Sequence, residues 1–563
     1  MNNDIFVEFN IVEKDIINDL YSFDSSSQSE FSNFQNIINK KSHDNVVYIE
    51  KDYFLLNGDF VFPQKNKEYN VGWESEALSN ENGDINVFVE FTFTNVHESA
   101  GLHLDFPEYS VPKNFTIFYK KENQIVFSKT INGNVNAGVD LIQDIKSWDC
   151  LRIEFSKTNP FQRIRINYIC FGINKVFKND SIISINAFVP GNIISDYDNC
   201  GTFSCELFGE KSDFSFLENL SNNLKNQTKI FINLKQGTEY DVFACYNFYC
   251  FSYDEKQKTA NITGYDILYF LGESYYEKGI VYTEGKKLKQ WAQDIASDIG
   301  INVVLDDYID MIYSLGYISE VPYREAFRLI AEAGTCCLNV DEEGRVCIIK
   351  KTFSDVKTIP DSDIVEGSVS ITEDTAYSGI EVNRYGFKKN DKSLEIGRLD
   401  DVALTWEPQD IEIVYSVYPV DISTVEVFVD DASGAVIVSK EVFSDKIFLS
   451  LKGTSVSKTF ITITGIPYNV TTLKDRFLQS DNSNVKKIEN NFLITSSLGY
   501  SVVNFQKDFL KKVNKLSFDT LRYDIYPFEK VFLNFLNKEA FVIGKTLNVS
   551  YNDIYCTIEV VYE

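Results

Sequence analysis

The 563-residue sequence has only three histidines, His43, His97 and His103, all near its beginning. Acid/base catalysis or zinc binding through histidine is therefore excluded for the long remainder of the chain. No GxSxG, HExxH, GxxxxGK[ST] or EF-hand pattern supplies a nucleophile, a metal-ligand set or a phosphate loop. Acidic residues are so numerous that a pair of catalytic carboxylates cannot be singled out. We therefore expect no enzyme activity, no catalytic residue and no cofactor.

Basic residues are also in short supply, with 54 Lys and Arg against 82 Asp and Glu and a net charge of -28. Binding to nucleic-acid phosphates requires a basic surface, so direct nucleic-acid binding is not expected. No apolar run reaches the roughly 18 residues that a membrane-spanning helix requires, and the first residues are acidic where a secretory signal is basic. We expect a chain that is made and kept in the cytoplasm and does not insert into a membrane.

The ten cysteines are spread through a long chain, whereas disulfide frameworks are typical of short secreted domains. Four residues separate Cys200 from Cys205, and four also separate Cys245 from Cys250, a spacing found in zinc sites. In a regular strand, however, residues five apart point to opposite faces. The sequence favours small buried thiols over zinc, and likewise favours loop or strand-edge histidines over a metal site at His97 and His103.

Aromatic residues are abundant, with 45 Phe and 32 Tyr, and they suit pleated sheets. Alternation is clearest over 163–169, where Ile164, Ile166 and Tyr168 face one way and the polar or charged residues between them face the other. The pattern predicts a mainly β, multidomain (α+β) fold with a jelly-roll or β-sandwich accessory domain. The predicted boundaries are an N-terminal arm over 1–45, the accessory domain over 46–173, β domains over 174–285 and 366–480, a small α/β unit over 286–365, and a C-terminal segment with one helix over 481–563.

Three stretches change to a helical period. Leu288, Trp291, Ile295 and Ile299 predict an amphipathic helix that ends at Gly300. A second helix is predicted from Pro322 to Gly334, followed by a hairpin that turns at 341–344. Apolar residues between 502 and 513 predict a third helix over 497–514.

Four stretches of the sequence resemble a family of minor structural tail proteins of phages and prophages of Gram-positive bacteria. The stretches are Glu50–Gly58 with Val71–Trp73 and Ser79–Gly83; Trp148–Phe155 with Arg163–Ile166 and Phe171–Gly172; Val321–Ala326 with Ile330–Gly334 and Asp341–Arg345; and Ile488–Ile494. They occur in the family's order and cover most of residues 46–563. The segment 198–207 is only loosely similar to its counterpart, and no peptidoglycan-degrading domain follows the hub-like part, so any cell-wall lysis is expected from another chain.

The resemblance implies a baseplate hub or tail-tip protein with hub-like β-barrel domains. It further implies a homotrimer that joins the tail tube and other baseplate proteins, located in the virion tail and assembled in the host cytoplasm. The first domain is similar to carbohydrate-binding-module jelly rolls, a fold that does not by itself grant sugar binding. The alternative function is therefore receptor binding, in which this domain recognises a host cell-wall glycan.

Three aromatic residues are candidate glycan contacts in that alternative: Trp73, Tyr109 and Trp148. A flat aromatic face stacks on a sugar ring, but large aromatic side chains more often fill a core. The core interpretation is the favoured one for all three.

Overall fold

A computed structural model describes residues 5–13, 16–38, 47, 50, 62, 71–191, 200–218, 220, 224–225, 228–236, 239–350, 355–373, 377–430, 434–453, 458–478, 484–496, 498–510, 512, 514–550 and 553–563. The chain divides into two compact units, one formed by 1–184 with 204–264 and the other by 185–203 with 265–563. Each unit is built from segments that are far apart in the sequence. Within the described residues, no helix is long and apolar enough to cross a membrane.

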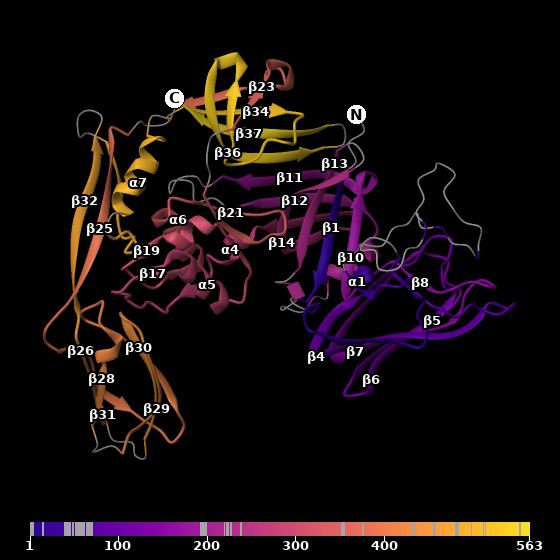
Figure 1. The fold of residues 1–563 in the computed structure, drawn as a ribbon, viewed down its shortest axis with the longest axis horizontal. Coiled ribbons are helices and arrows are strands. Elements are labelled where there is room, and N and C mark those ends of the chain that lie inside the picture. The colour runs from indigo at the N-terminus through magenta and orange to yellow at the C-terminus, as the bar shows by residue number, and fades with distance from the viewer. Residues whose placement is uncertain are drawn as a thin grey trace. The chain divides into compact units, whose positions relative to one another are not determined.

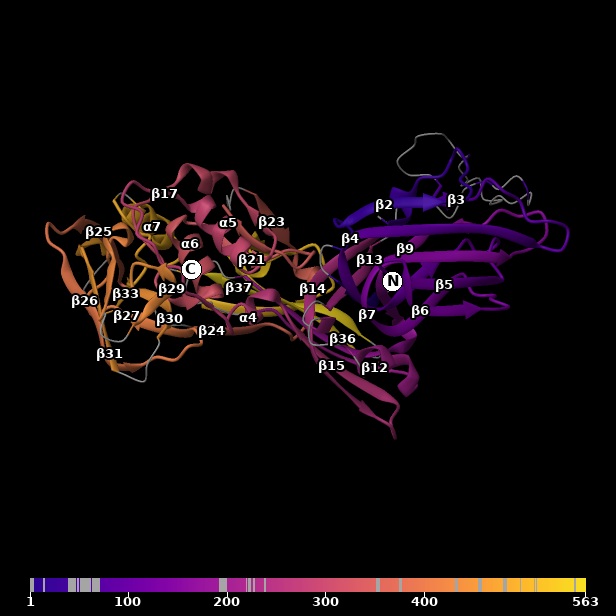
Figure 2. The same cartoon turned by 90° about the horizontal axis from the view of Figure 1, so that it is seen from below.

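The accessory domain of the first unit is a six-stranded sheet faced by a two-stranded pair, and its strands lie together in Figure 2. The sheet contains β2 (Leu20–Ser25), β4 (Asp84–Asp105), β7 (Gly138–Lys157), β5 (Asn114–Lys121), β6 (Gln124–Ile131) and β9 (Tyr168–Cys170); the pair is β3 (Trp73–Glu74) with β8 (Arg165–Ile166). Alternating residues of β4 and β7 face a core rich in Phe and Trp. Helix α1 (Phe34–Ile38) contributes Ile37 and Ile38 to the same core.

The N-terminal platform, as it is called here, is the part of the 13-stranded sheet that belongs mainly to the first unit, and it joins strands from both sides of the accessory domain. Its order is β10 (Gly172–Lys178), β1 (Ile5–Val12), β13 (Lys229–Gln236), β14 (Glu239–Asp254), β15 (Thr259–Tyr265) and β12 (Thr202–Phe208). Helix α2 (Ser215–Glu218) follows β12. In β1, Ile5, Val7, Phe9 and Ile11 alternate into the core, which is the pattern of a half-buried strand.

The beginning of the chain therefore differs from the predicted extended arm. Strand β1 pairs on both sides, Phe9 with Lys175 of β10 and with Ile230 of β13, while β2 pairs with β4 of the accessory domain. Residues 5–12 and 20–25 are strands of two sheets, because alternating apolar side chains bury one face wherever partner strands are available. The predicted division at residue 45 lies outside the described residues.

The second unit contains a C-terminal platform whose strands lie together in Figure 1. Its members are β11 (Ile182–Pro190), β36 (Lys538–Val549), β37 (Ile554–Tyr562), β34 (Asn514–Thr520) and β24 (Ser370–Glu373), with β35 (Lys530–Leu533) and β23 (Val356–Ile359) alongside. Residues 185–190 of β11 pair with 544–549 of β36, so this platform also joins segments that are far apart in the sequence.

A helical subdomain of the second unit follows the predicted helix, helix, hairpin order. It contains α4 (Ile267–Phe270), α5 (Leu288–Asp298), α6 (Tyr323–Ala333), β21 (Cys337–Val340) and β22 (Val346–Ile349). Short strands complete it: β16 (Tyr275–Tyr276) with β20 (Val321–Pro322), β17 (Lys286–Lys287) with β19 (Tyr313–Ser314), and β18 (Val303–Leu305), which pairs in parallel with β22. Both predicted helices and the hairpin are confirmed, and Gly300 with φ near +62° follows α5.

The predicted third helix is shorter than expected, since α7 spans Leu498–Lys507. It packs beside a ribbon of β25 (Gly379–Lys389), β32 (Tyr468–Leu478) and β33 (Val485–Ile488). Residue 513, the last of the apolar residues that indicated this helix, lies outside the described residues, and residue 514 begins β34.

Between β25 and β32 the chain forms a separate β-sandwich over residues 394–465, here called the tip sandwich, at the end of the ribbon in Figure 1. One sheet is β26 (Leu394–Ala403), β31 (Lys458–Gly465) and β28 (Glu426–Val429); the other is β27 (Gln409–Val414), β30 (Lys446–Lys452) and β29 (Val436–Val442). The range predicted as one domain, 366–480, thus contributes to three structures: the C-terminal platform, the ribbon and the tip sandwich.

The mainly β, multidomain character of the chain is confirmed. Within the described residues, however, every sheet is an open path of strands, and none closes into the barrel that the resemblance implied. Edge strands therefore remain at the ends of the sheets.

Candidate functional site

Trp73 and Trp148, two of the three candidate glycan contacts, are completely buried in the accessory domain. The Trp148 indole meets Tyr119 edge-on at 4.8 Å between ring centroids and Phe93 at 5.2 Å. Trp73 stacks on Phe155 at 6.3 Å. Neither indole presents a face to a ligand in this structure, so both act as core residues.

Tyr109, the third candidate, is half-buried beside Val71 and Phe31. Its carbonyl oxygen accepts a hydrogen bond from the Gln162 side chain at 3.3 Å. Since Trp73 and Trp148 lie in a different cluster, the three aromatic residues do not form a common platform.

Two histidines of β4 are each held between two carboxylates, while His43 lies outside the described residues. The ring of His97 is 3.1 Å from Glu13 and 2.8 Å from Asp19. His103 lies 3.2 Å from Asp105 and 2.7 Å from Asp140. With both ring nitrogens engaged, these histidines serve as links between neighbouring segments.

The pKa of His103 is set by two opposing effects. Burial disfavours the charged ring, but hydrogen bonds and charge attraction from Asp105 and Asp140 outweigh it and raise the pKa to about 9. His103 is therefore an imidazolium at neutral pH, which makes it a donor to carboxylates and unsuitable as a metal ligand.

Eight of the ten cysteines are buried, and none of the ten forms a disulfide bond in the described structure. The two candidate zinc pairs separate as strand geometry predicts: Cys205 and Cys245 are buried, while Cys250 is exposed. Cys200 accepts a hydrogen bond from Arg324 at 3.0 Å. Over the part of the chain that the structure describes, no group of three or more His, Cys, Asp or Glu side chains is arranged to hold a metal ion.

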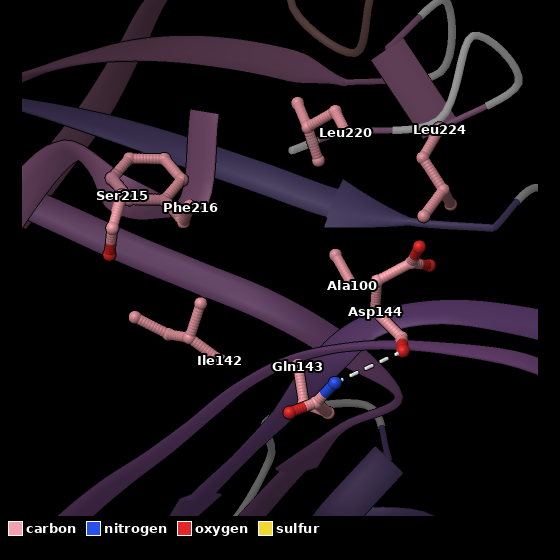
Figure 3. Close-up of a pocket in the computed structure, with 8 residues that line it drawn as sticks. All are labelled: Ala100, Ile142, Gln143, Asp144, Ser215, Phe216, Leu220 and Leu224. Atoms are coloured by element: carbon pink, nitrogen blue, oxygen red, sulfur yellow. Dashed lines mark hydrogen bonds between the residues drawn. The ribbon is translucent and has the colours of Figure 1, made fainter. Parts of the chain in front are cut away.

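A cavity of 330 Å³ lies in the first unit, between β4 and β7 on one side and the segment that includes α2 on the other (Figure 3). Ile142, Phe216 and Leu224 give it apolar walls, and Asp144 is the charged group in its lining. The Gln143 amide donates to the carbonyl oxygen of Asp144 at 3.4 Å. The lining also includes the hydroxyl of Ser215, which donates to the carbonyl oxygen of Ser212 at 2.8 Å.

The edge of the C-terminal platform is a different kind of candidate site. Strand β24 pairs with β34 on one side, Ile371 opposite Leu516, and all four of its residues are exposed. Among the described strands, none pairs with its other side. Val369 and Ile371 expose apolar side chains along this strand, and the nearby Val365 and Leu521, at the end of β34, are also exposed, Leu521 to 66%.

An exposed apolar edge strand is a template for pairing with another chain. The sequence analysis did not single out β24, because it placed 366–480 in one domain. A local signal was present in the alternation of 369–372, where Ser370 separates Val369 from Ile371 and Thr372 follows.

Comparisons with known proteins give distant structural likenesses. No family model and no curated protein matches the sequence. Similar solved structures include the 43 kDa tail protein of prophage MuSo2 from Shewanella oneidensis, 12% identical with a TM-score of 0.36, covering 69% of this chain and 95% of that one. A tail protein from Neisseria meningitidis MC58 is 10% identical with a TM-score of 0.39, covering 69% and 93%. Prophage tail protein gp18 from Listeria monocytogenes EGD-e is 8% identical with a TM-score of 0.35, covering 69% and 91%. These TM-scores are below 0.5, so the likenesses do not establish a shared function.

Proposed function

We propose that this chain is a non-enzymatic structural component of a phage or phage-derived tail, acting as the hub that joins the tail tube to the tip. The proposal starts from the four sequence stretches that resemble minor tail proteins in the family's order. The corresponding location is the virion tail or baseplate, after assembly in the host cytoplasm. Other tail proteins, including the tube, are the proposed partners.

The observation that carries the proposal is the construction of the two platforms. Strand β1 pairs with β10 and β13, which follow the accessory domain in the sequence. Strand β11 pairs with β36, which is more than three hundred residues away. The accessory domain and the tip sandwich are both inserted between strands of other sheets. Sheets that join remote segments, with whole modules inserted between their strands, support a scaffold role for this chain.

Assembly is proposed to use the β24 edge, with three copies of the chain closing into a ring. A ring requires head-to-tail contacts that return to the first subunit, and an open sheet edge offers one half of such a contact. The exposed Val369, Ile371 and Leu521 would be covered in the assembled state, as expected of an obligate interface.

The test is the mass of the purified full-length chain by light scattering at several concentrations. We expect a trimer of three 64.6 kDa chains. Ile371→Lys should shift it toward the monomer, because a charge at the edge cannot be buried without a partner. Val436→Lys is the matched control, since Val436 is also on an edge strand and is 53% exposed against 52% for Ile371.

A chain that remains a monomer at every concentration would count against the hub. A trimer that Ile371→Lys leaves intact would remove β24 from the interface. The alternative function, glycan recognition by the accessory domain, has less support, because Trp73 and Trp148 are buried. Of the three predicted contacts, Tyr109 is the one with a partly exposed side chain.

A further inference from the structure

The four tryptophans of the chain have two different environments. Trp73, Trp148 and Trp291 are completely buried, whereas Trp406 is 74% exposed. Tryptophan has one of the largest apolar surfaces of any side chain, so a mostly exposed indole lacks most of the hydrophobic stabilisation that burial would provide. Such a side chain is a candidate contact for a ligand.

Trp406 lies in the loop between β26 and β27, at one end of the tip sandwich. The opposite end is docked to the helical subdomain: Ser444 N donates to Gly279 O at 2.8 Å, and Lys446 contacts Glu320 at 2.7 Å. Strand β30 connects the two ends and, at about 3.3 Å per residue, separates them by roughly 20 Å. Trp406 is thus at the end of the sandwich remote from its attachment.

The loop that carries Trp406 has an anchored backbone. Leu404 is buried in the sandwich core. Gly453 N donates to Thr405 O at 2.8 Å, and the Thr405 hydroxyl donates to Glu407 O at 3.1 Å. A Cβ at position 453 would lie 2.8 Å from Leu404 Cβ, so glycine permits this close approach. The indole is therefore presented by a loop that loses little further freedom on binding.

The residues around Trp406 favour a neutral ligand. Asp401, Glu407 and Asp410 are exposed at this end of the sandwich. The register also brings two lysines to it, Lys452 next to the partner of Gln409 and Lys458 opposite Ala403. Attraction of an anionic polymer would require an excess of basic groups, so this excess of carboxylates disfavours acidic polysaccharides and nucleic acids. Carboxylate and amide groups such as those of Glu407 and Gln409 accept and donate hydrogen bonds to hydroxyl groups.

A protein-binding surface would be expected to cluster several apolar side chains around the aromatic anchor. The other exposed aromatics of the sandwich, Phe428 and Phe460, are instead on the strands β28 and β31. A single flat indole among hydroxyl, amide and carboxylate groups matches a sugar ring, which has an apolar C–H face and a polar rim.

We propose that the loop of Trp406 is a carbohydrate-binding site for a neutral glycan, with the indole as the stacking platform. The site is in the tip sandwich, separate from the accessory domain in which the sequence suggested sugar contacts. It does not depend on the hub function, since a monomer could bind in the same way.

Titration calorimetry of the full-length chain tests the site with three neutral probes: hexasaccharides of N-acetylglucosamine, of glucose and of galactose. Binding of at least one is expected, with a dissociation constant near or below about 1 mM, the strength of a few exposed contacts. Trp406→Ala should weaken it by about tenfold or more, while Trp406→Phe, which keeps a smaller ring, should retain part of the affinity. Phe428→Ala, which removes another exposed aromatic of the same sandwich, should leave binding unchanged.

Tryptophan emission gives a second measurement, because Trp406 is the exposed fluorophore among three buried ones. The bound sugar should protect it from quenching by iodide. Failure of all three probes to bind, binding that Trp406→Ala leaves intact, or binding confined to an acidic polysaccharide would each overturn the proposal. None of these results depends on whether the chain forms a trimer.

Discussion

The accessory domain and the tip sandwich are both antiparallel β domains, yet they use aromatic side chains in opposite ways. The accessory core contains two tryptophans and a group of phenylalanines in mutual ring contact. The core cluster of the tip sandwich is aliphatic apart from Tyr415, although Phe443 is buried beside it, and the one tryptophan of the sandwich is exposed. The comparison teaches that aromatic content does not locate a ligand site; the decisive property is whether a ring lies in a packed core.

The sharpest test of this contrast is truncation of one tryptophan in each domain. Trp148→Ala should destabilise the accessory domain by about 3–5 kcal/mol, because it empties a site filled by an indole between Tyr119 and Phe93. Trp406→Ala should change the free energy of unfolding by less than about 0.5 kcal/mol, as is usual for exposed positions. Urea denaturation followed by circular dichroism measures both. Equal losses would show that the two tryptophans do not differ in environment.

The second difference concerns pH. His103 has its pKa raised to about 9 from 6.5, so it binds a proton more tightly in the folded accessory domain than in the unfolded chain. Its stabilising contribution is full below pH 6.5 and is lost as the pH rises through about 9. The shift corresponds to up to about 3 kcal/mol.

The measurement is the unfolding free energy of the accessory domain from about pH 6 to about pH 10, a range that includes both pKa values of His103, with His103→Gln as control. In the variant, the unfolding free energy should decline much less over this pH range than it does in the unmodified chain. Residues 394–465 contain no histidine, so the tip sandwich should not share this dependence. An identical decline in the variant would assign the effect to other groups.

The third and smallest expected effect concerns how the tip sandwich is attached. Lys446 is only 2% exposed and lies 2.7 Å from Glu320, 3.1 Å from Glu412 and 3.6 Å from Glu277. Lys446→Met should weaken the attachment by roughly 1–3 kcal/mol, since it leaves three carboxylates facing one another, although each is partly hydrated. Faster amide exchange at Val281 and Ser444 would report the loosening, because Val281 N donates to the Ser444 hydroxyl.

Lys452→Met is the matched control for that experiment, since Lys452 lies on the same strand but is exposed. It should leave amide exchange at Val281 and Ser444 unchanged. Equal acceleration in both variants would argue against a specific role for Lys446.

The helices were predictable from sequence because their signals are local. Leu288, Trp291 and Ile295 recur at the helical period, and Gly300 and Gly334 mark the ends of the helical regions. The alternation of β1 was equally local, but its role was not. Its partners are more than 160 residues away, and nothing near Phe9 indicates that β10 and β13 will flank it.

The candidate site was less predictable for the same reason. Trp148 and Trp406 are the same residue type, and burial is decided by which strands fold over them. One local signal did distinguish Trp406: the Glu407-Pro408 step that follows it is typical of a loop, since proline restricts the preceding residue and lacks a backbone donor. Exposure of the indole itself required the structure.

The pairing of β1 with β13 also has a consequence for the order of events during translation. Ile5 and Leu234 are register partners, so β1 waits for its second neighbour while more than two hundred further residues are synthesised, about 20 s at a rate of roughly 10 residues per second. The accessory domain, encoded within this interval, can condense first on the ribosome. The N-terminal platform then forms late because its contacts join residues far apart in the sequence, and β1, its first strand to be synthesised, pairs only after the accessory domain has folded.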